Sequence, residues 1–255
     1  MATLTCVPPT IDRSLHERRR VLLVGDSITQ QSFSPAYQGW GAGICDWYQR
    51  SADVMNRGFS GYNSRWMRQS MQQMFPPITE YNENVILVTL FLGANDAASA
   101  PSPQHVPVAE YRSNMIYILN HLRSTFKSAV FVLITPPQVC NESWPTRSIS
   151  TTAEYANVVR RLGEFADVSV LDLWQEGEYR VELSDLRDGL HLGVDGNQKV
   201  LLGLQSLIRA KFPELSPEET ANGVPNLSYH FPQHGILGAS TDESASQQIL
   251  QSWKW

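Results

Sequence analysis

The chain has few cysteines, and they lie far apart. Among 255 residues only Cys6, Cys45 and Cys140 occur. Such a set offers neither a disulfide framework nor the close spacing of a structural zinc site. The six histidines form no His-Glu-x-x-His pattern either, and we expect no metal ion and no organic cofactor. Plain thiols suit a reducing compartment, so we predict a cytoplasmic protein.

Long hydrophobic runs and phosphate-binding glycine loops are also missing. No apolar stretch approaches the ~20 residues that a membrane helix needs, and residues 1–20 lack the apolar centre of a secretory signal. The sequence contains no Gly-x-Gly-x-x-Gly and no glycine-rich loop that ends in Lys-Ser or Lys-Thr. We therefore expect a protein without a membrane span whose chemistry is carried by its own side chains.

Positive charge is in slight deficit. The chain has 20 Lys and Arg against 25 Asp and Glu, a formal net charge of −5. No overall basic field is available to hold a polyanion. The one dense basic run, residues 18–20, precedes an apolar segment and is better explained as a solvated strand entrance than as a phosphate-binding patch. We therefore expect no nucleic-acid partner.

Short apolar runs rich in β-branched residues alternate with helix-length segments. The runs are continuous, as in strands that are buried on both faces of a sheet. Residues 108–122 place their apolar side chains on one helical face, and a last helix is expected at about 196–210. This alternation predicts a parallel sheet covered by helices on both faces, with functional groups at the carboxyl ends of its strands. The expected strands lie at 21–24, 53–56, 85–92, 130–134 and 168–171.

The composition changes after residue 211. From there to the end, five acidic residues face a single base, Lys254, yet the segment also carries large apolar side chains such as Trp253 and Trp255. Three arrangements stay open for it: docking on the domain, docking on a second subunit in a homodimer, or disorder. We predict an N-terminal lead over 1–20, one domain over 21–211 and an acidic extension over 212–255.

Two polar motifs could supply a nucleophile and its base. Gly25-Asp26-Ser27-Ile28-Thr29 follows the first strand, and Asp188-Gly189-Leu190-His191 precedes the last helix. A serine hydroxyl becomes a nucleophile when a base takes its proton, and a carboxylate must orient that base. Ser27, His191 and Asp188 fit these three roles. Taken alone, the first motif is better explained as a helix N-cap, and the second as a local cap or a core histidine.

Two further motifs follow the second and third expected strands. Residues 56–61 read Asn-Arg-Gly-Phe-Ser-Gly, and residues 93–96 read Gly-Ala-Asn-Asp. Acyl transfer develops negative charge on a carbonyl oxygen, which preorganised N–H donors stabilise. The backbone amide of Gly61 and the side chain of Asn95 can act as such donors, although each alone is better explained as a turn residue. The order of all four motifs is far more specific than any one of them.

Over about residues 20–210 these four blocks resemble the GDSL-type esterases of the SGNH hydrolase superfamily. Ile28 stands where the name motif has Leu. Residues 38–43 (Gln-Gly-Trp-Gly-Ala-Gly), 56–65 and 135–137 (Thr-Pro-Pro) are similar to the isoamyl acetate-hydrolysing branch. The resemblance implies an α/β fold: a flavodoxin-like three-layer α/β/α sandwich with a five-stranded parallel sheet in the order 2-1-3-4-5.

The resemblance also implies a function. A cofactor-free serine esterase would hydrolyse small acetate-type esters such as isoamyl acetate through an acyl-enzyme. The oxyanion would lie between the backbone amides of Ser27 and Gly61 and the side chain of Asn95. A carbohydrate acetylesterase and a longer-chain, lipase-like esterase of lipid degradation stay open as alternatives. A non-catalytic binding module would be expected to lack one of these residues. Four aromatic residues are candidates for lining the substrate pocket, and for each of them a place in the core or on the surface stays open as an alternative: Phe33, Trp40, Tyr62 and Trp66.

Overall fold

The structure is a computed structural model that describes residues 18–76, 84–166, 168–218 and 227. One parallel sheet holds the strands in the order β2-β1-β3-β4-β5. The predicted α/β fold and strand order are confirmed. The strands are β1 (Arg20–Gly25), β2 (Asp53–Gly58), β3 (Val85–Phe91), β4 (Val130–Ile134) and β5 (Ser169–Leu171). The α-helices are α2 (Ser27–Gln30), α3 (Trp40–Trp47), α4 (Ser64–Met74), α6 (Val108–Thr125), α7 (Ile149–Ala166) and α8 (Val194–Lys211).

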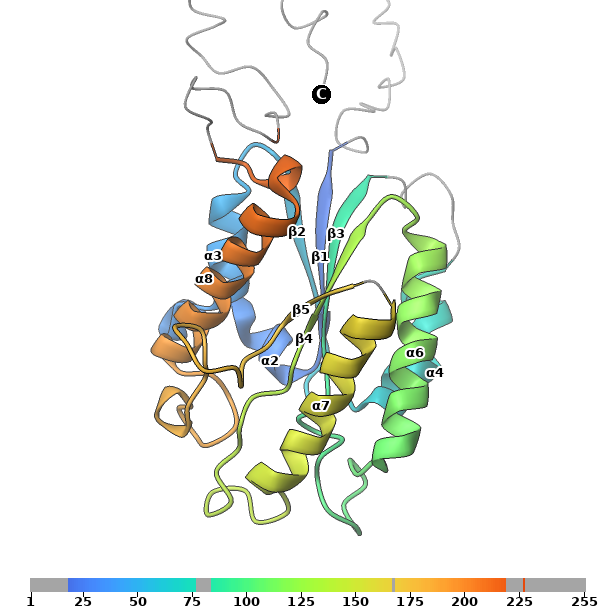
Figure 1. The fold of residues 1–255 in the computed structure, drawn as a ribbon, viewed down its shortest axis with the longest axis vertical. Helices are drawn as coiled ribbons and strands as arrows, with labels where there is room; N and C mark the ends of the chain where they lie inside the picture. The colour runs from blue at the N-terminus through green and yellow to red at the C-terminus, as the bar shows by residue number, and fades with distance from the viewer. Residues whose placement is uncertain (1–17, 77–83, 167, 219–226, 228–255) are drawn as a thin grey trace, which may run out of the picture.

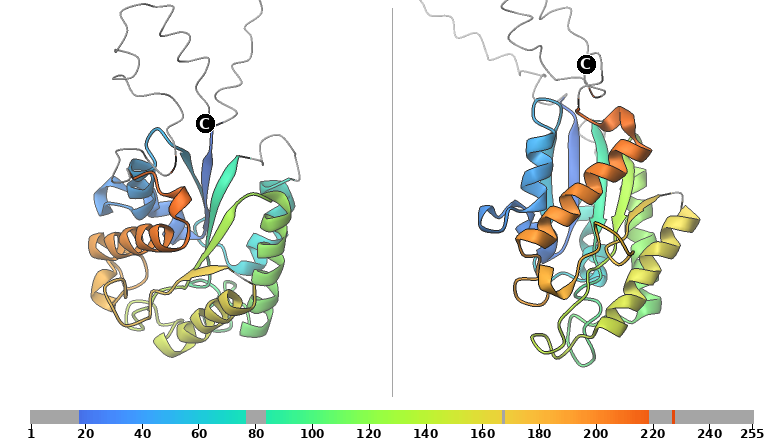
Figure 2. Two further views of the ribbon diagram at one scale, coloured as in Figure 1. Left: turned by 45° about the horizontal axis from the view of Figure 1, so that its top comes forward. Right: turned by 60° about the vertical axis from the view of Figure 1, so that its left-hand side comes forward.

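Helices cover both faces of the sheet (Figure 1). Strand side chains point alternately to the two faces, so in β1 Val21 and Leu23 belong to one core cluster while Leu22 and Val24 belong to the other. Helices α3 and α8 close the first cluster, and α4, α6 and α7 close the second (Figure 2). Burial on both faces explains why the strands read as continuous apolar runs.

The first part of the acidic extension packs on the domain. Glu218 accepts a hydrogen bond from Trp47 Nε1 at 3.1 Å and pairs with Arg209 of α8. Leu227 is buried in the core cluster of α3 and α8. These contacts lie at the amino ends of the strands, the end opposite to α2 (Figure 1). The rest of the extension (219–226 and 228–255) and most of the lead (1–17) lie outside the described residues.

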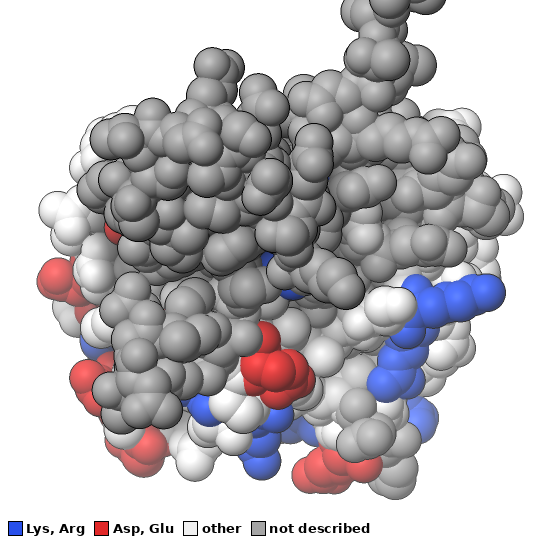
Figure 3. All heavy atoms as spheres, turned by 90° about the horizontal axis from the view of Figure 1, so that it is seen from above, with Lys and Arg blue, Asp and Glu red and all other residues white. Residues whose placement is uncertain are grey.

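Figure 3 looks onto that end of the molecule. Described Lys and Arg side chains and described Asp and Glu side chains both appear in this view, close to one another in several places. The described part of this face therefore presents charges of both signs and not a continuous basic surface. Within the ranges that the structure describes, no helix combines the length and the apolar character needed to cross a membrane.

Candidate active site

Three predicted residues from distant parts of the chain meet at the carboxyl edge of the sheet. Ser27 is the first residue of α2, directly after β1, and Asp188 and His191 lie in the loop before α8. His191 Nε2 is 2.9 Å from Ser27 Oγ, and His191 Nδ1 is 2.7 Å from Asp188 Oδ2. Carboxylate, imidazole and hydroxyl thus form one continuous line of hydrogen bonds. In this arrangement the imidazole can take the proton of the serine hydroxyl.

The loop of Asp188 folds around its own carboxylate. Asp188 Oδ1 accepts hydrogen bonds from the backbone N–H groups of Leu190 and His191, at 3.0 and 2.8 Å. Gly189 has a φ of +85° and lies where a Cβ would be 2.7 Å from Cys140 Cβ, so the turn needs glycine. Burial acts to raise the pKa of Asp188, but the hydrogen bonds from His191 and Leu190 outweigh burial and lower it. The carboxylate therefore stays ionised and can hold the imidazole in one tautomer.

Trp144 supports the same loop from the segment between β4 and α7. Its Nε1 donates a hydrogen bond to the backbone oxygen of Asp188 at 2.9 Å. Its ring meets the His191 ring edge to face, with ring centroids 6.1 Å apart. The sequence gives no sign of this role, because Trp144 stands in a loop with no recognisable motif around it.

The turn from β1 into α2 explains the Gly-Asp-Ser sequence. A Cβ on Gly25 would lie 2.1 Å from Thr29 Oγ1 and 2.5 Å from the backbone oxygen of Phe91, so only glycine fits. Asp26 Oδ1 accepts from the N–H of Ile28 at 2.9 Å and caps the helix. Ser27 follows at once and is thereby placed at the edge of the sheet with its hydroxyl toward His191.

Gly61 and Asn95 are joined by Gln104, another residue that the sequence analysis missed. Gln104 Nε2 donates to the backbone oxygen of Gly61 at 3.0 Å and to Asn95 Oδ1 at 3.1 Å. Asn95 Nδ2 donates to the backbone oxygen of Tyr62 at 2.9 Å. An amide nitrogen carries two hydrogens, so its second N–H can serve a bound ligand. Gly61 and Asn95, two of the three residues predicted to donate hydrogen bonds to the oxyanion, thus belong to one hydrogen-bonded unit after β2 and β3.

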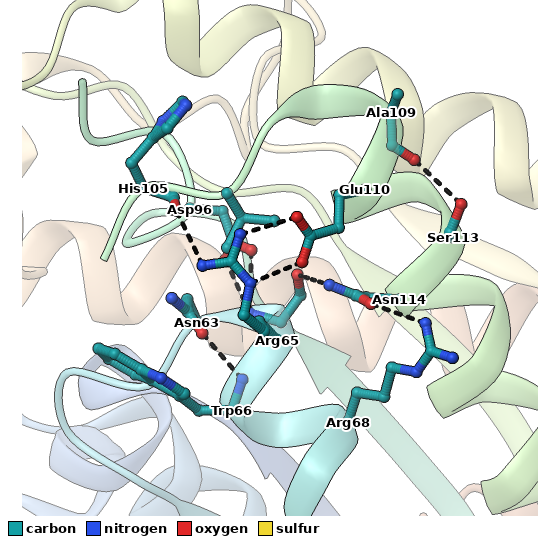
Figure 4. Close-up of polar contacts among 12 residues, drawn as sticks. Asn63, Arg65, Trp66, Arg68, Asp96, His105, Ala109, Glu110, Ser113 and Asn114 are labelled. Atoms are coloured by element: carbon teal, nitrogen blue, oxygen red, sulfur yellow. Dashed lines mark hydrogen bonds and ion pairs between the residues drawn. The ribbon is translucent and has the colours of Figure 1, made fainter. Parts of the chain in front are cut away.

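Asp96 ties the loop of Asn95 to the neighbouring helices (Figure 4). Its two carboxylate oxygens accept from the N–H of Ser64, the first residue of α4, at 2.9 and 3.2 Å. The next residue, Arg65, forms a two-pronged ion pair with Glu110 of α6 at 2.6 and 2.7 Å. Asp96 thus fixes the loop after β3 against α4, and the Arg65–Glu110 ion pair holds α4 against α6.

One of the four aromatic residues expected in the substrate pocket is placed elsewhere. Trp40 has no exposed surface and packs in the core against Phe91. The expectation for Trp40 was wrong, because its position in α3 turns the indole toward the sheet. Phe33 is half-buried and packs against the same core cluster, next to Gly41.

The other two aromatic residues lie beside the Asn95 loop. Tyr62 and Trp66 are half-buried and meet edge to face, with ring centroids 6.3 Å apart.

A small cavity lies next to the imidazole of His191. The residues that line it include none of the four aromatic residues named for the substrate pocket. Besides His191 it is lined by Ile28, Gln31, Tyr37, Arg187, Leu192 and Asn197.

Two carboxyl groups are buried beneath the nucleophile. Burial raises the pKa of Asp26 and of Asp96 to about 7. For Asp26, the nearby Asp96 adds to this rise. The hydrogen bond from Ile28 and the charge of Arg147 act in the opposite direction. The Asp26 Oδ2 atom is buried without a hydrogen-bond partner. The folded protein therefore holds protons that the unfolded chain releases near pH 4.

These groups should make the protein less stable at alkaline pH. Because their pKa is raised on folding, their contribution to stability is complete below pH ~4 and is lost as the pH rises through ~7. The free energy of unfolding, measured by urea titration, should be higher at pH 5 than at pH 8. The difference should be a few kcal/mol at most, since a shift of one pKa unit corresponds to about 1.4 kcal/mol. Asp26→Asn should reduce this difference.

The exposed Asp46 offers a matched control. Asp46→Asn should leave the difference between pH 5 and pH 8 as it is in the parent protein. An Asp26→Asn variant with the full parental pH dependence would show that Asp26 is not the titrating group.

A hydrogen-bonded Ser-His-Asp line at the edge of a parallel α/β sheet defines a serine hydrolase as the class of protein. Residues 23–199 match the GDSL-like lipase/acylhydrolase family. The isoamyl acetate-hydrolyzing esterase 1 homolog of Mus musculus is 37% identical over 82% of this chain and 91% of its own length. A GDSL esterase/lipase of Arabidopsis thaliana is 34% identical over 91% and 98%. The chain belongs to the GDSL-like lipase/acylhydrolase family and is a carboxylic ester hydrolase.

Solved structures share the fold at lower sequence identity. A lipase/acylhydrolase from Enterococcus faecalis is 24% identical, with a TM-score of 0.58, over 76% of this chain and 96% of its own. The acetyl xylan esterase AlAXEase is 18% identical, with a TM-score of 0.59, over 74% and 99%. Both similarities concern the architecture of the sheet and its helices.

Proposed function

We propose that this protein is a serine esterase that hydrolyses small acetate-type esters, isoamyl acetate among them, through an acyl-enzyme. The observation that carries the proposal is the unbroken line of hydrogen bonds from Asp188 through His191 to Ser27. The imidazole is within reach of the hydroxyl proton, and the ionised carboxylate orients it. These distances support the roles proposed for Ser27, His191 and Asp188 in acyl transfer.

In the first half of the reaction Ser27 Oγ attacks the ester carbonyl carbon and His191 Nε2 takes the hydroxyl proton. The carbonyl oxygen becomes an oxyanion, which the backbone N–H groups of Ser27 and Gly61 and the Nδ2 of Asn95 stabilise. The carbon–oxygen bond to the alcohol then breaks, and His191 gives its proton to the departing alkoxide. The acyl group stays on Ser27, and the alcohol leaves.

In the second half a water molecule takes the place of the alcohol. His191 removes a proton from the water as its oxygen attacks the acyl carbon, and a second oxyanion forms at the same donors. When the bond to Ser27 Oγ breaks, His191 returns the proton to the serine. The free acid leaves, and the enzyme is restored with its triad in the starting protonation state.

The names of relatives support the acetate-type substrate. The animal relatives at 36–37% identity carry the name isoamyl acetate-hydrolyzing esterase 1 homolog. We propose that the enzyme works in the cytoplasm, where the free thiols Cys45 and Cys140 would stay reduced. Residues 21–211 are the proposed hydrolase domain, with 212–255 as its extension.

A panel of esters tests the substrate. With p-nitrophenyl esters from acetate to laurate, kcat/KM should fall steeply beyond about four acyl carbons, because each buried methylene changes binding by only ~0.8 kcal/mol unless a pocket wall excludes it. Isoamyl acetate should be turned over faster than an acetylated sugar. Rates that climb toward laurate would support a lipase-like enzyme, and preference for the sugar a carbohydrate acetylesterase. No turnover of any ester would indicate a binding module.

A further inference from the structure

Arg147 is a buried cation next to the active site that the proposed reaction has not used. It lies in the loop between β4 and α7, and only 5% of its surface is exposed. Its Nε donates to the backbone oxygen of Ala94 at 2.9 Å, and its Nη2 donates to Asn95 Oδ1 at 3.1 Å and to Gln104 Oε1 at 2.8 Å. One guanidinium thus holds the backbone before Asn95, the Asn95 side chain and the residue that links Asn95 to Gly61.

These contacts decide how the Asn95 amide is oriented. Its oxygen accepts from two donors, Arg147 Nη2 and Gln104 Nε2, so the amide cannot turn its oxygen toward the substrate without losing both bonds. Its nitrogen donates one hydrogen to the backbone oxygen of Tyr62, which leaves the second hydrogen for the ester. A charged donor on the amide oxygen also draws electron density from the amide and makes its N–H a better donor.

The segment from Trp144 to Arg147 also contacts the loop of His191. The N–H of Arg147 donates to the backbone oxygen of Trp144 at 2.9 Å, and the guanidinium lies 5.2 Å from the centre of the Trp144 ring. Trp144 in turn holds the backbone of Asp188 and meets the ring of His191. Burial lowers the pKa of the Arg147 guanidinium, and the charge of Asp26, when that group is ionised, opposes this in part.

We infer that Arg147 is a positioning residue for ester hydrolysis, which acts through Asn95 and Gln104 to aim the side-chain donor at the oxyanion. The inference rests on the proposed function, since it requires Asn95 to meet the developing charge. A lysine cannot replace Arg147, because one ammonium cannot serve Ala94, Asn95 and Gln104 in the planar geometry of the guanidinium.

The test is a double-mutant cycle in the full-length protein. Arg147→Met should lower kcat roughly tenfold or more while KM for p-nitrophenyl acetate changes less than about twofold, because a misplaced donor is lost mainly from the transition state. Arg147→Lys should recover only part of kcat. In an Asn95→Ala background, Arg147→Met should change kcat by less than about twofold, since the group through which it acts is gone. A purely structural role would lower kcat in both backgrounds alike.

Arg160 is the matched control, because it is a half-buried arginine whose guanidinium bonds Asp172 and Asn157 and not the residues assigned here to the triad or the oxyanion site. Arg160→Met should leave kcat unchanged. If Arg147→Met does not fold, as judged by its thermal melt, Arg147→Lys carries the same cycle. Parental kcat in the Arg147 variants, or equal losses with and without Asn95, would overturn the inference. Ser27→Ala is measured alongside. If this variant stays active, the proposed serine esterase function fails. If it is inactive, the proposed function stands, and the double-mutant cycle tests the role of Arg147 alone.

Discussion

Ser27→Ala is expected to lower kcat on p-nitrophenyl acetate by on the order of 10⁶-fold, the loss seen when the nucleophile of a serine hydrolase is removed. The change deletes one oxygen, and Asp26 still caps α2 through the N–H of Ile28. The variant should therefore melt close to the parent. Steady-state kinetics and a thermal melt measure both effects, and a serine-reactive phosphonate should label the parent at Ser27 and leave the variant unlabelled.

His191→Ala should cost about as much as Ser27→Ala, because nucleophile and base act as one unit and the double variant should be little worse than either alone. Asp188→Asn should cost less, roughly 10⁴-fold, because an amide at this position favours the wrong imidazole tautomer without removing the base. The Ser27 assignment would be wrong if Ser27→Ala kept activity above that of His191→Ala, or if the phosphonate labelled another serine.

The second large effect concerns the oxyanion. Asn95→Ala should lower kcat by roughly 10²–10³-fold with little change in KM, because its Nδ2 meets negative charge only in the transition state. Asn95→Asp should be worse. Arg147 and Gln104 would hold one carboxylate oxygen, as they hold Oδ1 now, and the other would face the developing oxyanion and repel it. Steady-state kinetics on a good acetate ester separates kcat from KM.

Gly61→Ala tests the backbone donor of the same site. Gly61 has a φ of +81°, which an alanine adopts only with strain, although the nearest atom to a new Cβ would be Gln104 Nε2 at 3.7 Å. Activity should fall more than the melting temperature does, because a shifted amide no longer meets the oxyanion. An Asn95→Ala variant with parental kcat would show that the oxyanion lies elsewhere.

Much of the fold could be predicted because its strands are buried on both faces. β1, β3 and β4 are continuous apolar runs, and this pattern arises wherever helices cover a parallel sheet on both sides. β2 and β5 were weaker signals: β2 is half-buried along most of its length, and β5 has only three residues. The strand order came from the family resemblance, because periodicity within a strand carries no information about its neighbours.

The positions of Ser27, Asp188 and His191 could also be predicted, because each follows from local chemistry at a strand or helix end. Aromatic residues were harder to place. Trp40 was a candidate for the pocket, yet the direction of its side chain depends on how α3 rotates against the sheet. Only packing against Phe91 and the rest of the core determines that rotation.

The sequence by itself determined which segments form the sheet, which residues follow each strand and which chemistry they can carry, because these depend on short patterns along the chain. The tertiary structure decided how the site is held. Gln104 reaches Gly61 across 43 positions, and Arg147 reaches Asn95 across 52. Such contacts leave no local pattern, since their partners come together only when the loops after β2, β3 and β4 meet at one edge of the folded sheet.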